Sequence, residues 1–239
     1  MCNLYSELVG AAAIVAMAKA MNSGINFPPL PGVYPDKPAP IVRNGPNGRE
    51  LAMARWGLPS PDKHVATLNY NKGTTNVRRP EIKHWQQWMG VENRCVVPFT
   101  SFAEPTTIDG KTTNAWFALS EDEPLAFFAG AWTPWTGVRM VKEGQVTCDV
   151  FAFLTTDANA EVFEHHPKAM PVILRTPEEI DRWMTIPNAE IPDMQQTLPD
   201  GSLKIISFSR EHPRTAEFKE PKAKAEAIPK AQPEQGSLF

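Results

Sequence analysis

The sequence has little of what would place it in several large classes of protein. Its 239 residues include three cysteines, too few for a disulfide framework and typical of a reducing, cytosolic compartment. The longest apolar run, Leu8–Ala18, covers about 11 residues, whereas a membrane-spanning helix needs about 20. Glu7 precedes this run and no basic leader does, so it also lacks the features of a signal peptide. We therefore expect a cytoplasmic protein that does not associate with membranes.

Signatures of common catalytic and cofactor sites are missing too. There is no Walker-type glycine loop, no Gly-x-Ser-x-Gly elbow, no His-Glu-x-x-His, no paired Cys-x-x-Cys and no internal repeat. His165 and His166 are adjacent imidazoles, but no cysteine or further histidine lies near them in the sequence. We expect neither a metal site nor a cofactor.

Composition and length indicate one folded domain followed by a tail. Hydrophobic residues make up 42% and charged residues 21% of the chain, which is a globular composition. From about Glu217 the sequence changes to Lys, Ala, Glu and Pro, which cannot bury enough apolar surface to offset the entropy of ordering. We predict a domain over residues 1–216 and a disordered tail over residues 217–239.

Strand patterns outnumber helix patterns and do not alternate regularly with them. Helices are predicted at 8–18, where Ser6 is the expected cap, and at 80–89, 158–165 and 177–184, the last capped by Thr176. Strands are predicted at 51–56, 95–100, 115–119, 125–131, 148–155, 171–174 and 203–208, with Ile41-Val42 in a Pro/Gly-rich extended stretch. This pattern favours an α+β fold with an antiparallel, barrel-like β core and flanking helices.

Cys2 is the residue with the most distinctive chemistry. A small side chain at position 2 allows an aminopeptidase to remove Met1, which leaves an N-terminal cysteine. Such a residue carries an amine with a pKa of about 8 and a thiol with a pKa of about 8.5. The amine can condense with an aldehyde and the thiol can then close a thiazolidine ring, or the amine can act as base for the thiol in a hydrolase. Taken alone, cysteine at position 2 is more often accidental. Cys95 and Cys148 lie in strand patterns and are predicted to be structural.

Seven segments then occur in order across residues 2–174: MCNLYS, MARWGLPSP, TTNVRR, RCVVPFTSFAEP, FFAGAWTPW, FAFLTTDAN and HHPKAMPVIL. Together they resemble the SOS response-associated peptidase (SRAP) family, over nearly the whole chain before the tail. The resemblance implies an SRAP-like catalytic domain that recognises abasic sites in single-stranded DNA. It also implies a stable thiazolidine crosslink between the N-terminal cysteine and the opened sugar, which shields the lesion, and self-removal of what precedes the cysteine.

Site residues follow from the same resemblance. Cys2 matches the crosslinking nucleophile, Asn76 and Arg78 match an Asn-x-Arg pair near the N-terminus and the lesion phosphate, and Glu104 matches a glutamate beside the cysteine. A histidine before MPVIL matches the proton-shuttling histidine. Arg can bind a phosphate with two hydrogen bonds, and Glu and His can move the protons that ring closure requires.

The sequence departs from the family pattern at three places. Asn3-Leu4 replace the usual Gly-Arg, so any phosphate contact from that arginine is missing, and Ala103 and Pro105 replace the aromatic residues that flank the glutamate. The segment from His166 to Pro171 is one residue longer than usual and has Lys168 in place of arginine. The catalytic histidine is therefore open between His165 and His166. We favour His166, which precedes Pro167, although either could instead cap the preceding helix.

Charge is unevenly distributed. The net charge is −3, but residues 40–100 hold nine basic and four acidic residues, so this segment carries +5 and the remainder −8. Tryptophans 56, 85 and 88 lie in the same segment, and basic residues interleaved with flat aromatics suit a single-strand groove. One of Trp85 and Trp88 is expected in the core. The residues predicted to bind DNA are Arg55, Trp56, Arg78, Arg79 and Lys168.

The last five residues, Gln235-Gly236-Ser237-Leu238-Phe239, resemble the bacterial sliding-clamp-binding peptide. Gln235, Leu238 and Phe239 are the predicted clamp contacts, and a flexible tether suits such a peptide. We thus expect a monomeric, nucleoid-associated protein. Two alternatives stay open: a cysteine peptidase or amidase that uses Cys2, His166 and Glu104, and a non-covalent adaptor tethered to the clamp.

Overall fold

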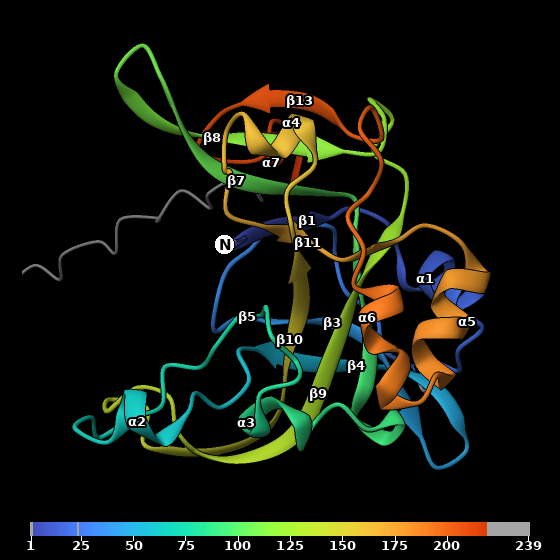
Figure 1. The fold of residues 1–239 in the computed structure, drawn as a ribbon, viewed down its shortest axis with the longest axis vertical. Coiled ribbons are helices and arrows are strands. Elements are labelled where there is room, and N and C mark those ends of the chain that lie inside the picture. Colours follow the sequence, from blue (N-terminus) through green and yellow to red (C-terminus); the bar gives the residue numbers. More distant parts are fainter. Residues whose placement is uncertain (1, 23, 219–239) are drawn as a thin grey trace, which may run out of the picture.

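A computed structural model describes residues 2–22 and 24–218, and Figure 1 shows the arrangement of the elements. Two β-sheets, one above the other in that view, form most of the molecule. The smaller sheet has five strands in the order β13 (Lys204–Phe208), β8 (Lys111–Ala118), β7 (Ser101–Ile108), β1 (Leu4–Glu7) and β2 (Leu30–Val33). The larger sheet closes into a barrel.

Five strands form the closed barrel. They are β10 (Gln145–Thr156), β4 (Gly48–Trp56), β3 (Pro38–Gly45), β6 (Arg94–Phe99) and β9 (Ala126–Val138), and the β9–β10 pairing completes the ring. Each neighbouring pair is antiparallel except β10–β4, which is parallel. The short strands β5 (Asn76–Val77), β11 (Met170–Pro171) and β12 (Ile173–Leu174) pair with β10 or β9. The predicted α+β fold with a barrel-like core is therefore confirmed, with one parallel pair in the ring.

Alternating side chains divide the barrel wall into two cores. On β10, Phe151 and Phe153 point into the barrel, whereas Val150, Ala152 and Leu154 belong to a separate outer cluster. This is the period of two that a strand imposes on its side chains. The interior is rich in aromatic rings, such as Phe99 stacked on Phe128 with centroids 3.9 Å apart.

Helices cover the outer cluster on one side of the barrel. The helices α1 (Ala11–Ala18), α5 (Pro177–Thr185) and α6 (Ile191–Met194) lie side by side there (Figure 1). The α5 helix begins with the predicted cap: Thr176 Oγ1 accepts from Glu179 N at 3.2 Å, and the Glu179 carboxylate accepts from Thr176 N at 3.3 Å. Both hydrogen bonds of this capping box satisfy backbone N–H groups that have no partner within the helix.

Other predicted helices are shorter than the sequence pattern indicates. The first turn of the predicted helix at 8–18 is absent, because β1 occupies Leu4–Glu7 and the helix begins after Gly10, so Ser6 is a strand residue and not a cap. The predicted helices at 80–89 and 158–165 are reduced to α3 (Lys83–Gln86) and α4 (Ala160–Phe163). The remaining short helices are α2 (Asp62–Val65) and α7 (Thr215–Phe218). The predicted tail from residue 219, with its clamp-binding residues, lies outside the described residues.

Candidate active site

Four separate segments meet at one end of the barrel. Cys2 lies two residues before the start of β1, which pairs with β7 through Leu4 and Ala103, and β7 then carries Glu104. Asn76 lies on β5, opposite Phe153 of β10. His166 lies in the loop from α4 to β11, and β11 pairs with the end of β10. Strand pairing thus brings together residues that are up to 164 positions apart in the sequence.

Cys2 is almost completely buried, with 1% of its surface exposed. Its thiol donates a weak hydrogen bond to Leu4 O at 3.5 Å. Burial raises the pKa of the Cys2 thiol well above its ordinary value, and the charge of Glu104 raises it further. The thiol therefore carries its proton near neutral pH, and a reaction at sulfur requires a neighbouring base.

Asn76 fixes the backbone of Cys2. Its Nδ2 donates to Cys2 O and to Thr75 Oγ1, both at 2.7 Å. Its Oδ1 is buried and accepts no hydrogen bond from the described residues. An unused buried acceptor is costly, so this oxygen is available to a donor from a bound molecule.

Glu104 and His166 form an acid–base pair beside the cysteine. Glu104 Oε2 lies 3.8 Å from His166 Nε2, and the glutamate is fully buried. Burial raises the pKa of the Glu104 carboxyl to about 8. Burial, followed by nearby positive charge that includes Lys168, lowers the pKa of His166. At neutral pH the pair therefore offers a proton on the carboxyl and a neutral imidazole, which suits proton transfer in both directions.

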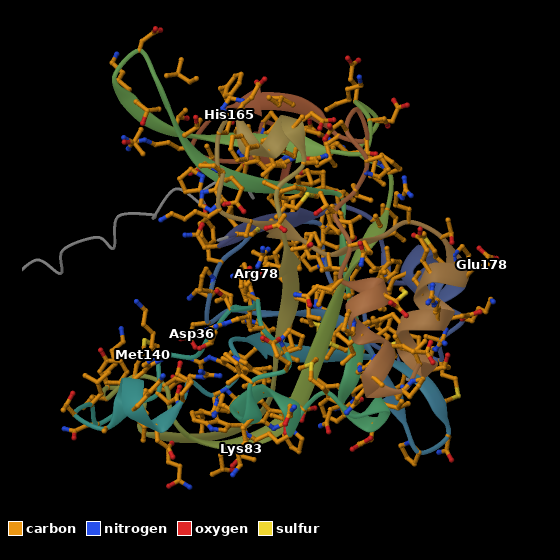
Figure 2. The ribbon with its side chains drawn as sticks, in the orientation of Figure 1. Asp36, Arg78, Lys83, Met140, His165 and Glu178 are labelled. Atoms are coloured by element: carbon orange, nitrogen blue, oxygen red, sulfur yellow. The ribbon has the colours of Figure 1, made fainter. Side chains whose placement is uncertain are left out.

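The two adjacent histidines face different surroundings. His165 Nδ1 lies 3.1 Å from Thr106 Oγ1, and its ring contacts Phe117 and Phe208 on the five-stranded sheet. His166, not His165, is therefore the histidine that faces Glu104, and its catalytic role stays a prediction. Figure 2 labels His165 next to the five-stranded sheet.

Three of the predicted DNA-binding cations lie at the surface near this site. Arg78 follows β5 and donates from Nη2 to Asp157, while 37% of its side chain is exposed. Arg79 and Lys168 are exposed. In Figure 2, Arg78 lies on the same side of the molecule as Asp36 and Met140, whereas Glu178 lies on the opposite side.

Two other predicted DNA contacts are wrong. Trp56 is 1% exposed, because it points into the barrel, where its ring stacks on Phe153 with centroids 5.2 Å apart. Arg55 points outward, but its guanidinium forms paired hydrogen bonds with both Asp36 and Glu143. These bonds raise its pKa and leave no free edge for a phosphate. Of the other two tryptophans, Trp85 is 8% exposed and Trp88 is partly buried, which agrees with one of them lying in the core.

Thr155 was not singled out from the sequence, and it lies on β10 where that strand meets β5 and β11. Thr155 follows Leu154, which pairs with Val77 of β5, and itself pairs with Pro171 of β11. Its hydroxyl is buried and has no partner among the described residues. The residue lies within the segment FAFLTTDAN, but a threonine in a strand pattern carries no chemical signal of its own.

Neither a metal centre nor a membrane span is evident in the described part of the chain. No group of three or more His, Cys, Asp and Glu side chains in that part is placed to hold a metal ion. None of the helices in residues 2–22 and 24–218 is both long and apolar enough to cross a bilayer.

The chain is similar to a described protein family and to curated proteins. The profile of the family described as SOS response associated peptidase (SRAP) matches residues 1–211. The Bacillus subtilis proteins named abasic site processing protein YoqW and YobE are 31% and 29% identical to the chain over 160 and 164 residues. These matches cover 66% of this chain and, respectively, 66% and 68% of the relatives, so the chain spans about two thirds of their length.

Solved structures show the same fold at low sequence identity. A protein from Bordetella bronchiseptica superimposes with a TM-score of 0.66 at 22% identity, covering 85% of this chain and 97% of the other. One from Bacteroides thetaiotaomicron gives 0.65 at 19% identity, with 85% and 90% covered. The match of the family profile to residues 1–211 shows that the chain belongs to the SOS response associated peptidase (SRAP) family.

Proposed function

We propose that the protein recognises abasic sites in single-stranded DNA and binds them covalently through Cys2 after Met1 has been removed. The observation that carries this proposal is the meeting of Cys2, Asn76, Glu104 and His166 at one end of the barrel. The names of the curated relatives, abasic site processing proteins, support the same kind of substrate. The covalent bond shields the lesion from strand cleavage.

The chemistry requires only an aldehyde, an amine and a thiol. The Cys2 amine adds to the aldehyde carbon of the opened sugar to give a carbinolamine, which loses water to form a Schiff base. The thiol sulfur then adds to the same carbon, and its proton passes to nitrogen as the five-membered thiazolidine ring closes. One water molecule leaves in total, and no electron donor or acceptor is needed.

The residues around Cys2 have protonation states that suit these steps. The protonated Glu104 carboxyl can donate to the departing hydroxyl, and neutral His166 can accept the thiol proton. Asn76 fixes the Cys2 carbonyl through Nδ2, and its unused Oδ1 can accept a hydrogen bond from a hydroxyl of the opened sugar. Arg78, Arg79 and Lys168 supply positive charge for the phosphates on either side.

A crosslinking assay tests the proposal. An oligonucleotide with one abasic site is incubated with wild-type protein, with Cys2→Ser and with Cys148→Ser, and the products are separated on a denaturing gel. We expect an adduct with the wild type and with Cys148→Ser, since Cys148 lies on β10 and is outside the site. Intact mass should show loss of Met1 and, in the adduct, loss of one water.

The Cys2→Ser variant should still bind single strands but form no stable adduct. An adduct of equal yield and heat stability in that variant would refute the thiazolidine route. Retention of Met1 in the wild type would remove the free aminothiol, and only the non-covalent adaptor would then be left.

A second candidate is peptidase activity at the chain's own N-terminus. It is favoured by the position of Cys2 beside Glu104 and His166, which is a nucleophile next to an acid–base pair. A chain that carries a short extension before Cys2 tests it. Spontaneous loss of the extension, slowed by Glu104→Gln, supports self-cleavage, whereas turnover of an unrelated peptide without DNA would indicate a general peptidase.

We also propose that the C-terminal peptide binds the replication sliding clamp through Gln235, Leu238 and Phe239. Two apolar side chains in a short peptide are enough to fill a shallow apolar pocket. Fluorescence polarisation of a labelled 20-residue tail peptide against the purified clamp measures this binding. Equal affinity after Leu238→Ala and Phe239→Ala would exclude it.

A further inference from the structure

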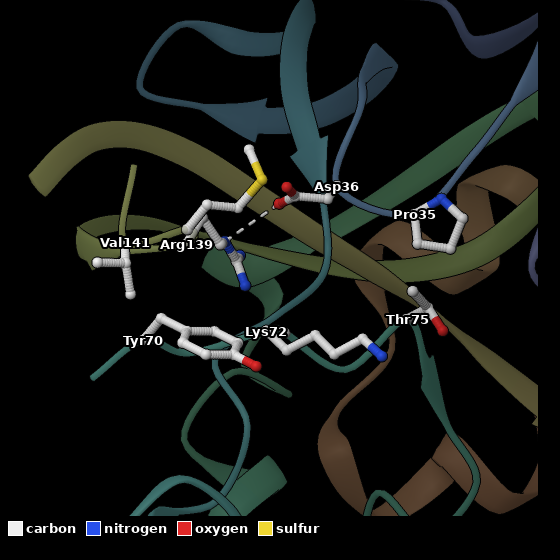
Figure 3. Close-up of a pocket in the computed structure, with 9 residues that line it drawn as sticks. Pro35, Asp36, Tyr70, Lys72, Thr75, Arg139 and Val141 are labelled. Carbon is white, nitrogen blue, oxygen red and sulfur yellow. Dashed lines mark ion pairs between the residues drawn. The ribbon is translucent and has the colours of Figure 1, made fainter. Parts of the chain in front are cut away.

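The strand β5 carries Asn76 and leads directly to Arg78, yet it has little support of its own. It is two residues long, and β10 is the only strand of the described residues that pairs with it. The segment before it borders open space, because Lys72, Gly73 and Thr75 line a hollow of about 590 Å³ (Figure 3). So short a ladder fixes a backbone poorly. The positions of Asn76 and Arg78 therefore depend on contacts from other segments.

The start of β5 is fixed from inside the barrel. Thr75 O accepts hydrogen bonds from Trp56 Nε1 at 3.0 Å and from Phe153 N at 3.4 Å. The paired residues of β5 and β10 then end with Val77 and Leu154. The next residue of each strand, Arg78 on one side and Thr155 on the other, lies beyond this ladder.

Gln195 joins the two strands where their ladder ends. Its side-chain Nε2 donates to Arg78 O at 2.8 Å and to Thr155 O at 2.7 Å. Both acceptors are carbonyl oxygens, and a side-chain NH₂ group has two hydrogens to donate. One amide group therefore continues the connection between β5 and β10 by one further residue on each strand.

The loop that carries Gln195 is itself tied to the end of β10. Gln195 follows α6, where its backbone N donates to Ile191 O at 3.0 Å. Its backbone O accepts from Thr156 Oγ1 at 3.1 Å, and Thr197 Oγ1 donates to Asp157 O at 2.9 Å. The side chain of Gln195 therefore extends from a backbone that is held on both sides.

The same loop holds Arg78 at its backbone and at its side chain. Gln195 binds the Arg78 carbonyl, while Arg78 Nη2 donates to the carboxylate of Asp157, the residue whose backbone Thr197 binds. Arg78 Nη1 is buried and has no acceptor among the described residues. An unused buried donor is costly, so this edge of the guanidinium suits a phosphate oxygen. The direction of that edge depends on where the loop places Arg78.

We propose that Gln195 is a positioning residue, which sets where Arg78 presents its guanidinium to a phosphate of the bound strand. The inference rests on the proposed function, in which Arg78 supplies charge for that phosphate. Gln195 lies 117 positions after Arg78 and outside the seven sequence segments, the last of which ends at Leu174. Gln195 acts through Arg78 and not on the DNA.

Binding measurements on matched variants test this role. The Cys2→Ser chain is titrated by fluorescence anisotropy against a labelled strand that carries a stable tetrahydrofuran abasic analogue. Gln195→Met keeps the length of the side chain but removes its donors, and we expect it to weaken binding about tenfold, as for a displaced hydrogen bond to a charged group. Gln196→Met is the control, because the exposed Gln196 side chain donates to Pro192 O within its own loop. It should bind as the parent does.

A double-mutant cycle shows whether Gln195 acts through Arg78. The variants are Arg78→Ala, Gln195→Met and the two combined. We expect the double variant to bind as Arg78→Ala does, because the change at Gln195 then has no guanidinium left to displace. Losses that add in the double variant, or unchanged binding by Gln195→Met, would overturn the inference.

Salt dependence gives a readout that a merely structural role would not move. Gln195→Met changes no charge, so the slope of log K against log salt can decrease only if a cation has left its phosphate. We expect a decrease of about 0.7, equal to that of Arg78→Ala. Misfolded chains would lower the amplitude of the titration and not this slope, and a slope equal to the parent's would overturn the inference. Failure of the wild type to form an adduct would instead refute the proposed function, because these titrations do not depend on crosslinking.

Discussion

At the scale of single residues, burial sets the chemistry around Cys2. Glu104 would be charged at neutral pH in water, but inside the site its pKa is about 8. His166, which lies far from Cys2 along the chain, has its pKa moved in the opposite direction. When the pKa values of two neighbouring groups shift in opposite directions, the group with the raised pKa can act as the acid and the other as the base.

The Glu104 shift predicts the pH dependence of crosslinking. The protonated form of a carboxyl that acts as an acid disappears as pH rises through its pKa. The rate of crosslinking by the wild type should therefore fall above pH about 8. Glu104→Gln keeps the shape and polarity of the neutral carboxyl but carries no transferable proton. We expect this variant to crosslink at least tenfold more slowly at pH 7 and to lack the alkaline fall. The measurement is single-turnover adduct formation between pH 6 and 9.5, and an unchanged alkaline limb in Glu104→Gln would contradict this role for Glu104.

Which residues could be predicted depends on how their roles arise. Cys2, Asn76 and Glu104 were identified because they lie in recognisable sequence motifs, and the structure brings them together. Trp56 was misplaced because its sequence neighbour Arg55 points outward, and adjacent strand residues face opposite sides. Only closure of the barrel shows which of the two sides is the interior.

At the scale of elements, β1 is the strand that positions Cys2. It pairs with β2 on one side and β7 on the other, and its four residues are all buried. Its last residue, Glu7, accepts a hydrogen bond from Val9 N at 2.8 Å, and burial raises the pKa of its carboxyl to about 8. The strand therefore ends on an acid that the fold keeps protonated.

Glu7→Gln should stabilise the protein at alkaline pH. The folded pKa of about 8 lies above the ordinary value of 4.5, so the folded state holds an extra proton between these pH values. The free energy of unfolding then decreases as pH rises through this window. Removing this carboxyl should raise stability at pH 8 by about 1 to 3 kcal/mol and leave it nearly unchanged at pH 4.5. The stability of Glu7→Gln should still depend on pH to some extent, because burial also raises the pKa of Glu104.

Urea unfolding at both pH values measures this difference. Glu121→Gln, at an exposed position, serves as the control and should change neither value. A Glu7→Gln variant that is less stable than the wild type at pH 8 would mean that the disturbed hydrogen-bond geometry outweighs the removed charge.

Elements with a local signal were predicted well. The start of α5 follows from Thr176, Pro177 and Glu179, three neighbours whose cap forms whatever the rest of the chain does. β1 had no such signal, because four residues before an alanine-rich run resemble the start of a helix. Its strand conformation depends on pairing with β7, about 100 residues later, which no local pattern contains.

At the scale of the whole molecule, the basic segment predicted from the sequence divides into two groups. Arg43, Arg49, Arg55 and Arg78 form ion pairs with acidic residues, and Arg94 is fully buried, where it donates to Met89 O and Trp183 O. The exposed members fall within residues 63–83: Lys63, Lys72, Arg79 and Lys83. The surface that remains for DNA is therefore narrower than the charge count indicates.

Salt dependence distinguishes these two groups. Each cation removed from a phosphate of a bound single strand reduces the slope of log K against log salt by about 0.7. Arg79→Ala should therefore reduce the slope for a tetrahydrofuran strand by about that amount, whereas Lys204→Ala, on β13, should leave it unchanged. The titrations are done between 50 and 300 mM salt with the Cys2→Ser chain. Equal slopes for the parent and Arg79→Ala would show that Arg79 does not bind the DNA.

The pairing of β1 with β7 also has a consequence for the order of events during synthesis. β7 partners Leu4, Tyr5 and Ser6 through Ala103, Phe102 and Ser101, so the first strand cannot complete its sheet until these residues have left the ribosome. At about 5 to 20 residues per second, roughly 100 residues take on the order of 5 to 20 s. During that interval Cys2 has not yet been buried, and an aminopeptidase at the ribosome can still reach the residue before it. Translation speed through β2–β6 thus sets how long Cys2 stays accessible before the fold closes around it.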